Sequence, residues 1–237
     1  MTGSARIVIV GGHGKVALAA VPRLAAAGFD VDAVIRNPAH AAEVSAAGAE
    51  PVLLDIERAT EAELAEAFDG AAAVVFSAGA GGGNPARTAA VDHDAAVRTM
   101  RAALEAGVRR YVMVSYLRAD TDVDRLDPGD SFFPYARAKH DADAALRSMG
   151  ADSTGLDYTI LGPASLTTGP GTGHIRVVGA DEAARPPETT GERLVVSREN
   201  VAAVIAHVVA TGAAGRETVR FVDGDTPIAE AIPAPRA

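Results

Sequence analysis

The stretch Arg-Ile-Val-Ile-Val-Gly-Gly-His-Gly-Lys-Val-Ala, residues 6–17, decides the fold that we predict for this chain. Residues 6–10 are mostly β-branched, which is typical of a short buried strand. A glycine-rich turn follows at once, and residues 16–27 then predict an alanine-rich helix that ends at Gly28. A strand, a tight turn and a helix in this order form the beginning of a βαβ unit.

The spacing of the glycines predicts what this turn binds. Gly12, Gly14 and Ala17 fit the pattern G-x-G-x-x-G/A, and Gly11 begins the related pattern G-x-x-G-x-x-G/A. Such a turn brings backbone N–H groups against a pyrophosphate, and the start of the helix adds a partial positive charge. The sequence therefore predicts a dinucleotide site that begins with Gly11, Gly12, His13, Gly14, Lys15 and Val16.

The rest of the chain continues the alternation of strand and helix. Strands are predicted at residues 31–35, 51–54, 72–76, 111–114, 158–161, 175–178 and 219–222, and helices at 39–47, 61–68, 89–106, 135–149 and 197–210. This alternation predicts the α/β class, with a Rossmann-type, doubly wound parallel sheet in three αβα layers. The length favours a single domain over residues 1–237, with a small C-terminal substrate-side region. We expect loops 117–133 and 164–193 to lie on the substrate side.

Composition narrows the classes of partner. The net charge is −9, from 31 acidic and 22 basic residues, which argues against nucleic acid and against an anionic membrane surface. The chain has no cysteine, which excludes disulfides and thiolate chemistry, and its six histidines show no metal-binding pattern. It has no apolar run long enough for a membrane span and no signal region, so we expect a cytoplasmic protein with a small-molecule substrate, as a monomer or homodimer.

The residues that follow the second, third and fourth predicted strands indicate which dinucleotide binds and how it lies. Arg36 ends the second strand, where a guanidinium suits a 2′-phosphate, so we expect NADP(H) rather than NAD(H). The alternative is that Arg36 is only a solvated loop residue. Asp55, followed by Ile56, either accepts a hydrogen bond from the adenine amine or only caps its turn. Small residues would let the cofactor lie along the sheet edge at Ser77, Ala78 and Gly79.

Three polar residues are placed for proton chemistry. Ser115 ends the fifth strand, while Tyr135 and Lys139 are four residues apart on the next predicted helix and therefore share a face. A nearby ammonium stabilises a tyrosinate, and a serine hydroxyl can hold a substrate oxygen beside it. The alternative is a core tyrosine beside a surface lysine.

With these residues the chain resembles the short-chain dehydrogenase/reductase superfamily. The likeness rests on the glycine turn, the Tyr-Val-Met-Val-Ser strand that ends in Ser115, Tyr135-Ala-Arg-Ala-Lys139, and Leu156-Asp-Tyr-Thr-Ile-Leu-Gly-Pro163. It is most similar to the atypical, single-domain NAD(P)-binding members of the epimerase/dehydratase-like and NmrA-like kinds. The resemblance implies that Tyr135 is the general acid/base and that Ser115 positions the substrate oxygen. It also implies that Lys139 binds ribose and lowers the tyrosine pKa, and that Pro163 borders the cofactor.

The sequence departs from that family at two places. Asp92 stands where the family has Asn, and it either relays a proton, binds Lys139 or marks a drift away from catalysis. Gly162 replaces the usual Arg before Pro163, which removes a contact for an anionic substrate. The leading hypothesis is an NADP-dependent reductase or dehydrogenase of small carbonyls or alcohols. The alternatives are an epimerase/dehydratase-like enzyme and a non-catalytic, NmrA-like redox-sensing regulator.

Overall fold

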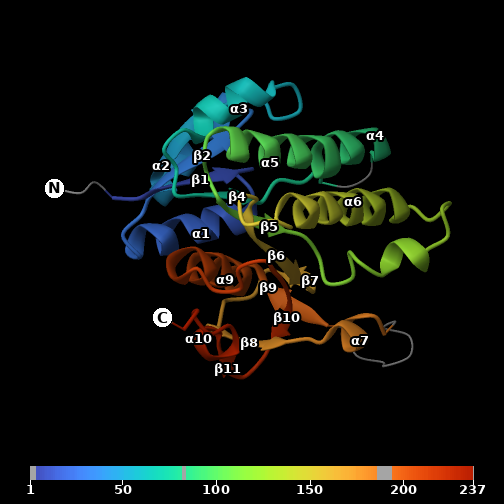
Figure 1. Ribbon diagram of the computed structural model, residues 1–237. Helices are drawn as coiled ribbons and strands as arrows, with labels where there is room; N and C mark the ends of the chain where they lie inside the picture. Colours follow the sequence, from blue (N-terminus) through green and yellow to red (C-terminus); the bar gives the residue numbers. More distant parts are fainter. Residues whose placement is uncertain (1–3, 82–83, 186–193, 237) are drawn as a thin grey trace.

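A twisted sheet with helices on both faces forms the centre of the computed structural model, which describes residues 4–81, 84–185 and 194–236 (Figure 1). Its parallel strands are β1 (Arg6–Val10), β2 (Asp30–Ile35), β3 (Glu50–Leu53), β4 (Ala73–Phe76), β5 (Arg110–Val114), β6 (Asp157–Pro163) and β10 (Glu217–Asp223). Across the sheet they lie in the order β10-β6-β5-β4-β1-β2-β3. The chain starts in the middle, runs outward to β3 and returns to β4, so the strand order reverses between β1 and β4. Ligands of doubly wound sheets bind at that reversal, outside the carboxyl ends of the strands. The predicted fold class is confirmed.

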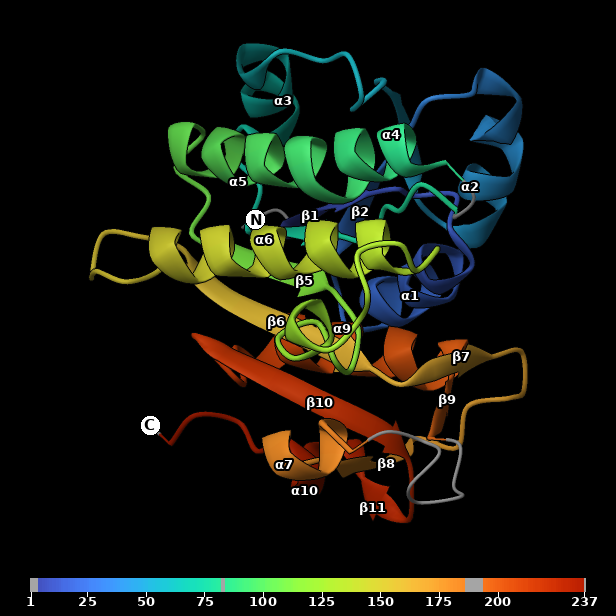
Figure 2. The same cartoon turned by 90° about the vertical axis from the view of Figure 1, so that its right-hand side faces the viewer.

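The helices divide between the two faces of the sheet. One face carries α1 (Lys15–Ala26), α2 (Ala41–Ala47) and α9 (Arg198–Thr211), and the other carries α3 (Glu61–Phe68), α5 (Ala96–Glu105) and α6 (Phe133–Met149) (Figures 1 and 2). Strand β1 shows why both faces are covered. Its Ile7 and Ile9 are buried against the first set, whereas Val8 and Val10 are buried against the second.

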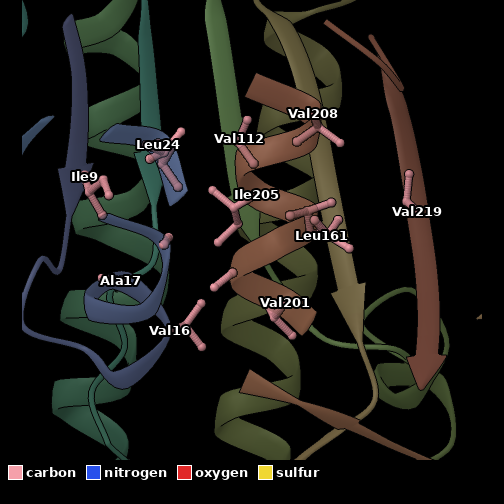
Figure 3. Close-up of a cluster of buried hydrophobic side chains, with 14 of the residues drawn as sticks. Ile9, Val16, Ala17, Leu24, Val112, Leu161, Val201, Ile205, Val208 and Val219 are labelled. Carbon is pink, nitrogen blue, oxygen red and sulfur yellow. The ribbon is translucent and has the colours of Figure 1, made fainter. Parts of the chain in front are cut away.

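Small aliphatic side chains fill the core on the α1/α9 face. Figure 3 shows Val201, Ile205 and Val208 of α9 between α1 and the strands, with Ala17 of α1 among them. Ala17 is fully buried, and its small size lets α1 approach its neighbours closely. Among the fully buried aromatic side chains, Phe68, Phe76 and Tyr111 belong to the opposite face, and Phe221 belongs to this one. Since only 4% of the residues are aromatic, aliphatic side chains have to form most of the core.

The C-terminal part extends the sheet and adds a small one beside it. Strand β8 (His174–Val177) runs antiparallel to β10, and β11 (Thr226–Pro227) runs antiparallel to β8. Strands β7 (Ser165–Thr167) and β9 (Val195–Ser197) pair separately, in parallel. The prediction of a strand at 175–178 is confirmed by β8, one residue earlier, whereas two- and three-residue strands are too short to show a period and were not predicted. This part also holds α7 (Ala180–Ala183) and α10 (Ile228–Ala231). Within the predicted loop 164–193, residues 186–193 lie outside the described residues.

The predicted helix over 89–106 is confirmed as a helical segment, but its winding is not uniform. The segment is divided into α4 (Pro85–Thr88), a π-helix η2 (Ala89–Ala95) and α5, in which only the last part has ordinary helical winding beyond one turn. Asp92 lies within the π-helix, and its Oδ2 accepts a hydrogen bond from the backbone N–H of Ala80 at 3.2 Å. Single-turn π-helices occur often at functional sites.

Helix ends follow their sequence signals more closely. Ser197 begins α9 by accepting a hydrogen bond from the N–H of Asn200, and Gly48 ends α2 in the left-handed conformation. The 3₁₀ turns η1 (Pro38–His40) and η3 (Asp122–Asp124) lie in connections, and α6 starts two residues before the predicted Tyr135. None of the helices in the described segments has the length and apolar character needed to cross a lipid bilayer.

Candidate active site

The glycine turn after β1 has the shape that a pyrophosphate requires. Gly11 has a φ of +83°, and its carbonyl oxygen accepts a hydrogen bond from the N–H of Gly14 at 2.9 Å, which closes the turn. A Cβ on Gly11 would lie 2.6 Å from the Cα of Ala78, so the turn packs directly on the chain that follows β4. Gly14 begins α1 without a side-chain cap, and the first turn of α1 has no acidic residue. The donors at this helix start therefore suit an anionic group.

We expect Gly12→Ala to destabilise the protein. An added Cβ would lie 2.5 Å from the Cβ of Ala33 and 2.9 Å from its Cα, on the neighbouring strand β2. Overpacking of this kind costs about 1–3 kcal/mol of unfolding free energy. Thermal unfolding measures the loss, with Gly169→Ala as the matched control, because a Cβ there meets nothing within 4 Å. Equal melting temperatures for the two variants would contradict the close packing of the turn on β2.

A groove of about 900 Å³ runs from this turn along the carboxyl ends of the strands. It brings together most of the residues that the sequence singled out: Gly14, Lys15, Val16, Ser77, Ala78, Gly79, Asp92, Ser115, Tyr135 and Lys139. Gly11 and Gly12 form the turn beneath it. The groove is continuous from the predicted pyrophosphate position to the predicted catalytic residues.

The other predicted cofactor residues lie apart from the lining of this groove. His13 stacks on His40 at 3.6 Å between ring centroids and is hydrogen-bonded to Glu43. Arg36 is half exposed and forms an ion pair with Glu57. Asp55 caps its turn by accepting a hydrogen bond from the Glu57 N–H, which is one of the two alternatives predicted for it. The carbonyl oxygen of Ile56 accepts a hydrogen bond from Arg98, and Pro163 ends β6.

Ser115, Tyr135 and Lys139 meet where β5 ends against the first turns of α6. Ser115 continues the sheet for one residue, because its N–H donates to the carbonyl oxygen of Leu161. Lys139 is 1% exposed, and its Nζ donates to the carbonyl oxygen of Val114 at 2.8 Å. Its ammonium also lies 5.8 Å from the centroid of the Phe76 ring. The lysine is therefore part of the buried site and not a surface residue.

Two buried carboxylates complete the cluster, and sequence analysis missed one of them. Ser115 donates its hydroxyl proton to Oδ2 of Asp143 at 2.6 Å, while Oδ1 of Asp143 is buried without a hydrogen-bond partner among the described residues. Asp143 follows Lys139 by four residues on α6, so it shares the face of Tyr135 and Lys139. That repeated spacing was the available signal. Asp92 of η2 is the second carboxylate and is 1% exposed.

The chain shares its sequence pattern with a known family of proteins. The profile of the NAD(P)H-binding family matches residues 11–212, from the glycine turn to the end of α9. The chain belongs to this NAD(P)H-binding family. It is an atypical member of the short-chain dehydrogenase/reductase kind, with relatives that are described as epimerases and as oxidoreductases.

Three similar proteins show the range of this NAD(P)H-binding family. The uncharacterised sugar epimerase YhfK of Bacillus subtilis is 36% identical over 203 residues, which are 85% of this chain and 86% of YhfK. A structure from Bacillus halodurans, described as a candidate NAD-dependent epimerase/dehydratase, has a TM-score of 0.80 at 30% identity, with 96% of this chain and 98% of that chain covered. The oxidoreductase ylbE of Lactococcus lactis has a TM-score of 0.78 at 28% identity, with 95% and 94% covered.

Burial shifts the pKa values of the ionisable groups at this site. It lowers the pKa of Lys139 and raises the pKa of both Asp143 and Asp92, although the lysine and the carboxylates partly offset these shifts by mutual attraction. Burial also raises the pKa of Tyr135, and the charges of Asp92 and Asp143 raise it further. The lowering of the tyrosine pKa by Lys139, which the resemblance implies, stays a prediction. Burial first, and the two carboxylates second, raise the pKa of Tyr135 in this structure.

A second cavity, of about 300 Å³, adjoins the groove. The two share Ser115, Phe132, Tyr135 and Leu166. The rings of Tyr116, Phe132 and Tyr135 form one of its sides, with centroids 5.3–5.6 Å apart. The rest of the lining is mainly aliphatic, with Arg118 and Asp122 among the polar residues. Pro163, which we predicted beside the cofactor, lines this second cavity instead.

We expect the Ser115–Asp143 pair to be energetically coupled. Asp143→Leu would leave the buried Ser115 hydroxyl without its acceptor, and Ser115→Ala would leave Asp143 without its donor, each at a cost of about 1–3 kcal/mol. The double variant removes both polar groups, so its loss should be smaller than the sum of the single losses. Denaturant unfolding of the four proteins measures this coupling. Additive losses would show that the hydrogen bond contributes nothing.

Proposed function

We propose that this protein is an NADP-dependent oxidoreductase that acts on a small carbonyl or alcohol. The observation that carries the proposal is the junction of the long groove and the smaller cavity at Ser115 and Tyr135. A cofactor in the groove would reach this junction from the glycine turn, and a small substrate in the second cavity would reach it from the other side. The two reactants would then be held side by side, which supplies much of the rate in such reactions.

The bound nicotinamide supplies or accepts the hydride, and the protein supplies the proton. Tyr135 donates its hydroxyl proton to the carbonyl oxygen in the direction of reduction and takes it back in the direction of oxidation. Ser115 holds the substrate oxygen, with its own rotamer set by Asp143. Lys139 binds ribose hydroxyls and supplies positive charge beneath Tyr135. The raised pKa of Tyr135 keeps it protonated near neutral pH, the form that donates a proton in reduction, but it also makes the phenol a weaker acid, which the bound substrate has to offset.

Arg36 supports NADP(H) as the preferred cofactor. It lies at the end of β2, where many NAD-binding proteins have a carboxylate for the ribose hydroxyls. A guanidinium at this position attracts a phosphate and cannot accept a hydrogen bond. The groove and its glycine turn accommodate either nucleotide, so the preference rests on this end of the site.

An epimerase is the second candidate, because YhfK is described as a sugar epimerase. Such an enzyme would oxidise and reduce the same substrate with a cofactor that stays bound, and no net NADPH would be consumed. The aromatic and aliphatic lining of the second cavity favours a small, weakly polar carbonyl compound over a nucleotide-sugar.

A substrate screen distinguishes the two candidates. The purified protein is mixed with NADPH and a panel of small aldehydes, ketones and quinones, and the loss of NADPH absorbance is followed. A parallel reaction with a nucleotide-sugar and catalytic NADP is examined for the epimer by chromatography. Consumption of NADPH that depends on a carbonyl compound supports the reductase. Epimer formation without net consumption would replace it with the second candidate.

A further inference from the structure

Three charged residues from separate segments converge beyond the end of β2. Oε1 of Glu57 accepts a hydrogen bond from Nη1 of Arg36 at 2.8 Å and another from Nε of Arg87 at 3.1 Å. Arg36 directly follows β2, Glu57 follows β3, and Arg87 belongs to α4, which starts at the edge of the groove. One carboxylate oxygen therefore joins two guanidinium groups, and the cluster keeps one positive charge in excess.

The surrounding structure holds this cluster in place. Nη1 of Arg87 donates to the carbonyl oxygen of Ala80 at 2.9 Å, and its backbone N–H is capped by Asn84. The backbone of Glu57 is fixed from two sides, because Asp55 accepts its N–H and Nη2 of Arg98 donates to its carbonyl oxygen. Two guanidinium groups are thus preorganised around a position filled by an anionic oxygen.

We propose that Arg36 and Arg87 together bind the 2′-phosphate of NADP, and that this phosphate takes the position between them that the Glu57 carboxylate holds in the structure. The inference rests on the proposed function for the choice of a dinucleotide and adds to it a second arginine and a competing carboxylate. A phosphate monoester is nearly dianionic and has three acceptor oxygens, so it can bind both guanidinium groups at once. Glu57 weakens this binding, because its own charge has to leave that position first.

The test uses 2′,5′-ADP and ADP, which share the adenosine diphosphate part and differ in the 2′-phosphate. Neither contains nicotinamide, so their binding does not depend on the residues that we assign to catalysis. Calorimetric titration of the wild type should give tighter binding of 2′,5′-ADP. Arg87→Ala should weaken the binding of 2′,5′-ADP by about tenfold, which is the scale of a hydrogen bond to a charged group, and should leave the affinity for ADP unchanged. Arg58→Ala is the matched control, since Arg58 follows Glu57 directly and its side chain is 88% exposed.

Glu57→Gln is the second variant and keeps the size of the side chain. It should tighten binding of 2′,5′-ADP by roughly threefold, the scale of a partly exposed ion pair, without strengthening ADP. If Arg87→Ala weakens both nucleotides alike or neither, or if Glu57→Gln weakens ADP, the inference is overturned, and in the latter case Glu57 reads the ribose hydroxyls. Equal binding of the two nucleotides by every variant would also overturn it while the cofactor site stands. A wild type that binds neither nucleotide would overturn the proposed function as well.

Discussion

Tyr135→Phe is expected to abolish most of the turnover while leaving the affinity for NADPH unchanged. The substitution removes one oxygen atom and keeps the ring that packs with Tyr116 and Phe132. A positioned acid typically contributes about 10²–10⁴-fold to such a rate, so the variant should lose activity on that scale. Initial rates of carbonyl-dependent NADPH consumption measure the loss, and calorimetry measures the affinity.

Tyr116→Phe is the matched control for that experiment. Tyr116 is adjacent to Ser115 in sequence and lines the second cavity, and its buried hydroxyl faces Asp122, another residue of that lining. Its removal should change KM more than kcat, because we place it against the substrate and not at the proton transfer. A Tyr135→Phe variant with near wild-type kcat would remove Tyr135 from the mechanism.

The pH dependence of the wild type should follow the raised pKa of Tyr135. Since burial and two carboxylates favour the protonated phenol, the fraction of active acid stays constant through neutral pH. Reduction should therefore be flat across neutral pH and fall only on the alkaline side. Oxidation of the corresponding alcohol needs the tyrosinate, so its rate should rise with pH over the same range.

Lys139→Met should have the second large effect, on activity and on the pH dependence of stability together. The ammonium that we place beneath Tyr135 and against ribose is lost, so kcat/KM should fall by about 10²-fold or more. Met is unbranched and of similar length, and it fills the same buried space. The loss therefore reports the charge rather than a cavity.

The stability change of this variant should depend on pH with a definite sign. In the wild type, Lys139 lowers the pKa of Asp92 and Asp143, so its removal lets both pKa values rise further. A carboxyl group with a raised folded-state pKa contributes stability at low pH, and that stability is lost as pH rises through the folded pKa. The lysine, whose folded pKa is lowered, contributes the opposite slope, which also disappears.

We therefore expect the melting temperature of Lys139→Met, relative to wild type, to decrease steadily from acidic to alkaline pH. Arg137→Met is the control, because Arg137 lies on the same helix with an exposed side chain. A difference that stays constant with pH would mean that the lysine and the two carboxylates do not interact.

The strands and helices of the βαβ units were predictable because each is long enough to show a period. The glycine turn was predictable because its backbone geometry restricts the residue type, as at Gly11 and Gly12. The division of the 89–106 helix was not predictable, since a π-helix has no distinct pattern of side chains. The ion pairs of Glu57 depend on three separate segments that meet in space, which no local sequence pattern predicts.

The sequence contained enough information to predict Asp143. It also contained a second indication of the site, in the distribution of its lysines. Twenty of the twenty-two basic residues are Arg, and the only two lysines, Lys15 and Lys139, both line the groove. A lysine gives up its proton when buried, whereas an arginine does not. In a chain that uses arginine almost everywhere else, retention of lysine at a buried position favours a chemical role. The direction of the Tyr135 pKa was beyond sequence reasoning, because it depends on the burial of three groups together.

Because of the π-helix η2, the number of residues in this segment matters as much as which residues they are. Its hydrogen bonds reach one residue further along the chain than those of an α-helix, so the segment stores one residue that ordinary winding does not need. Loss of a single residue between Ala89 and Asp92 would let the backbone rewind as one uninterrupted α-helix into α5. Residues on its N-terminal side would then turn by about 100° relative to α5, since an α-helix has 3.6 residues per turn. Arg87 would turn away from Glu57 in the same movement, so one surplus residue fixes how Arg87, where we propose that the 2′-phosphate binds, is oriented relative to α5.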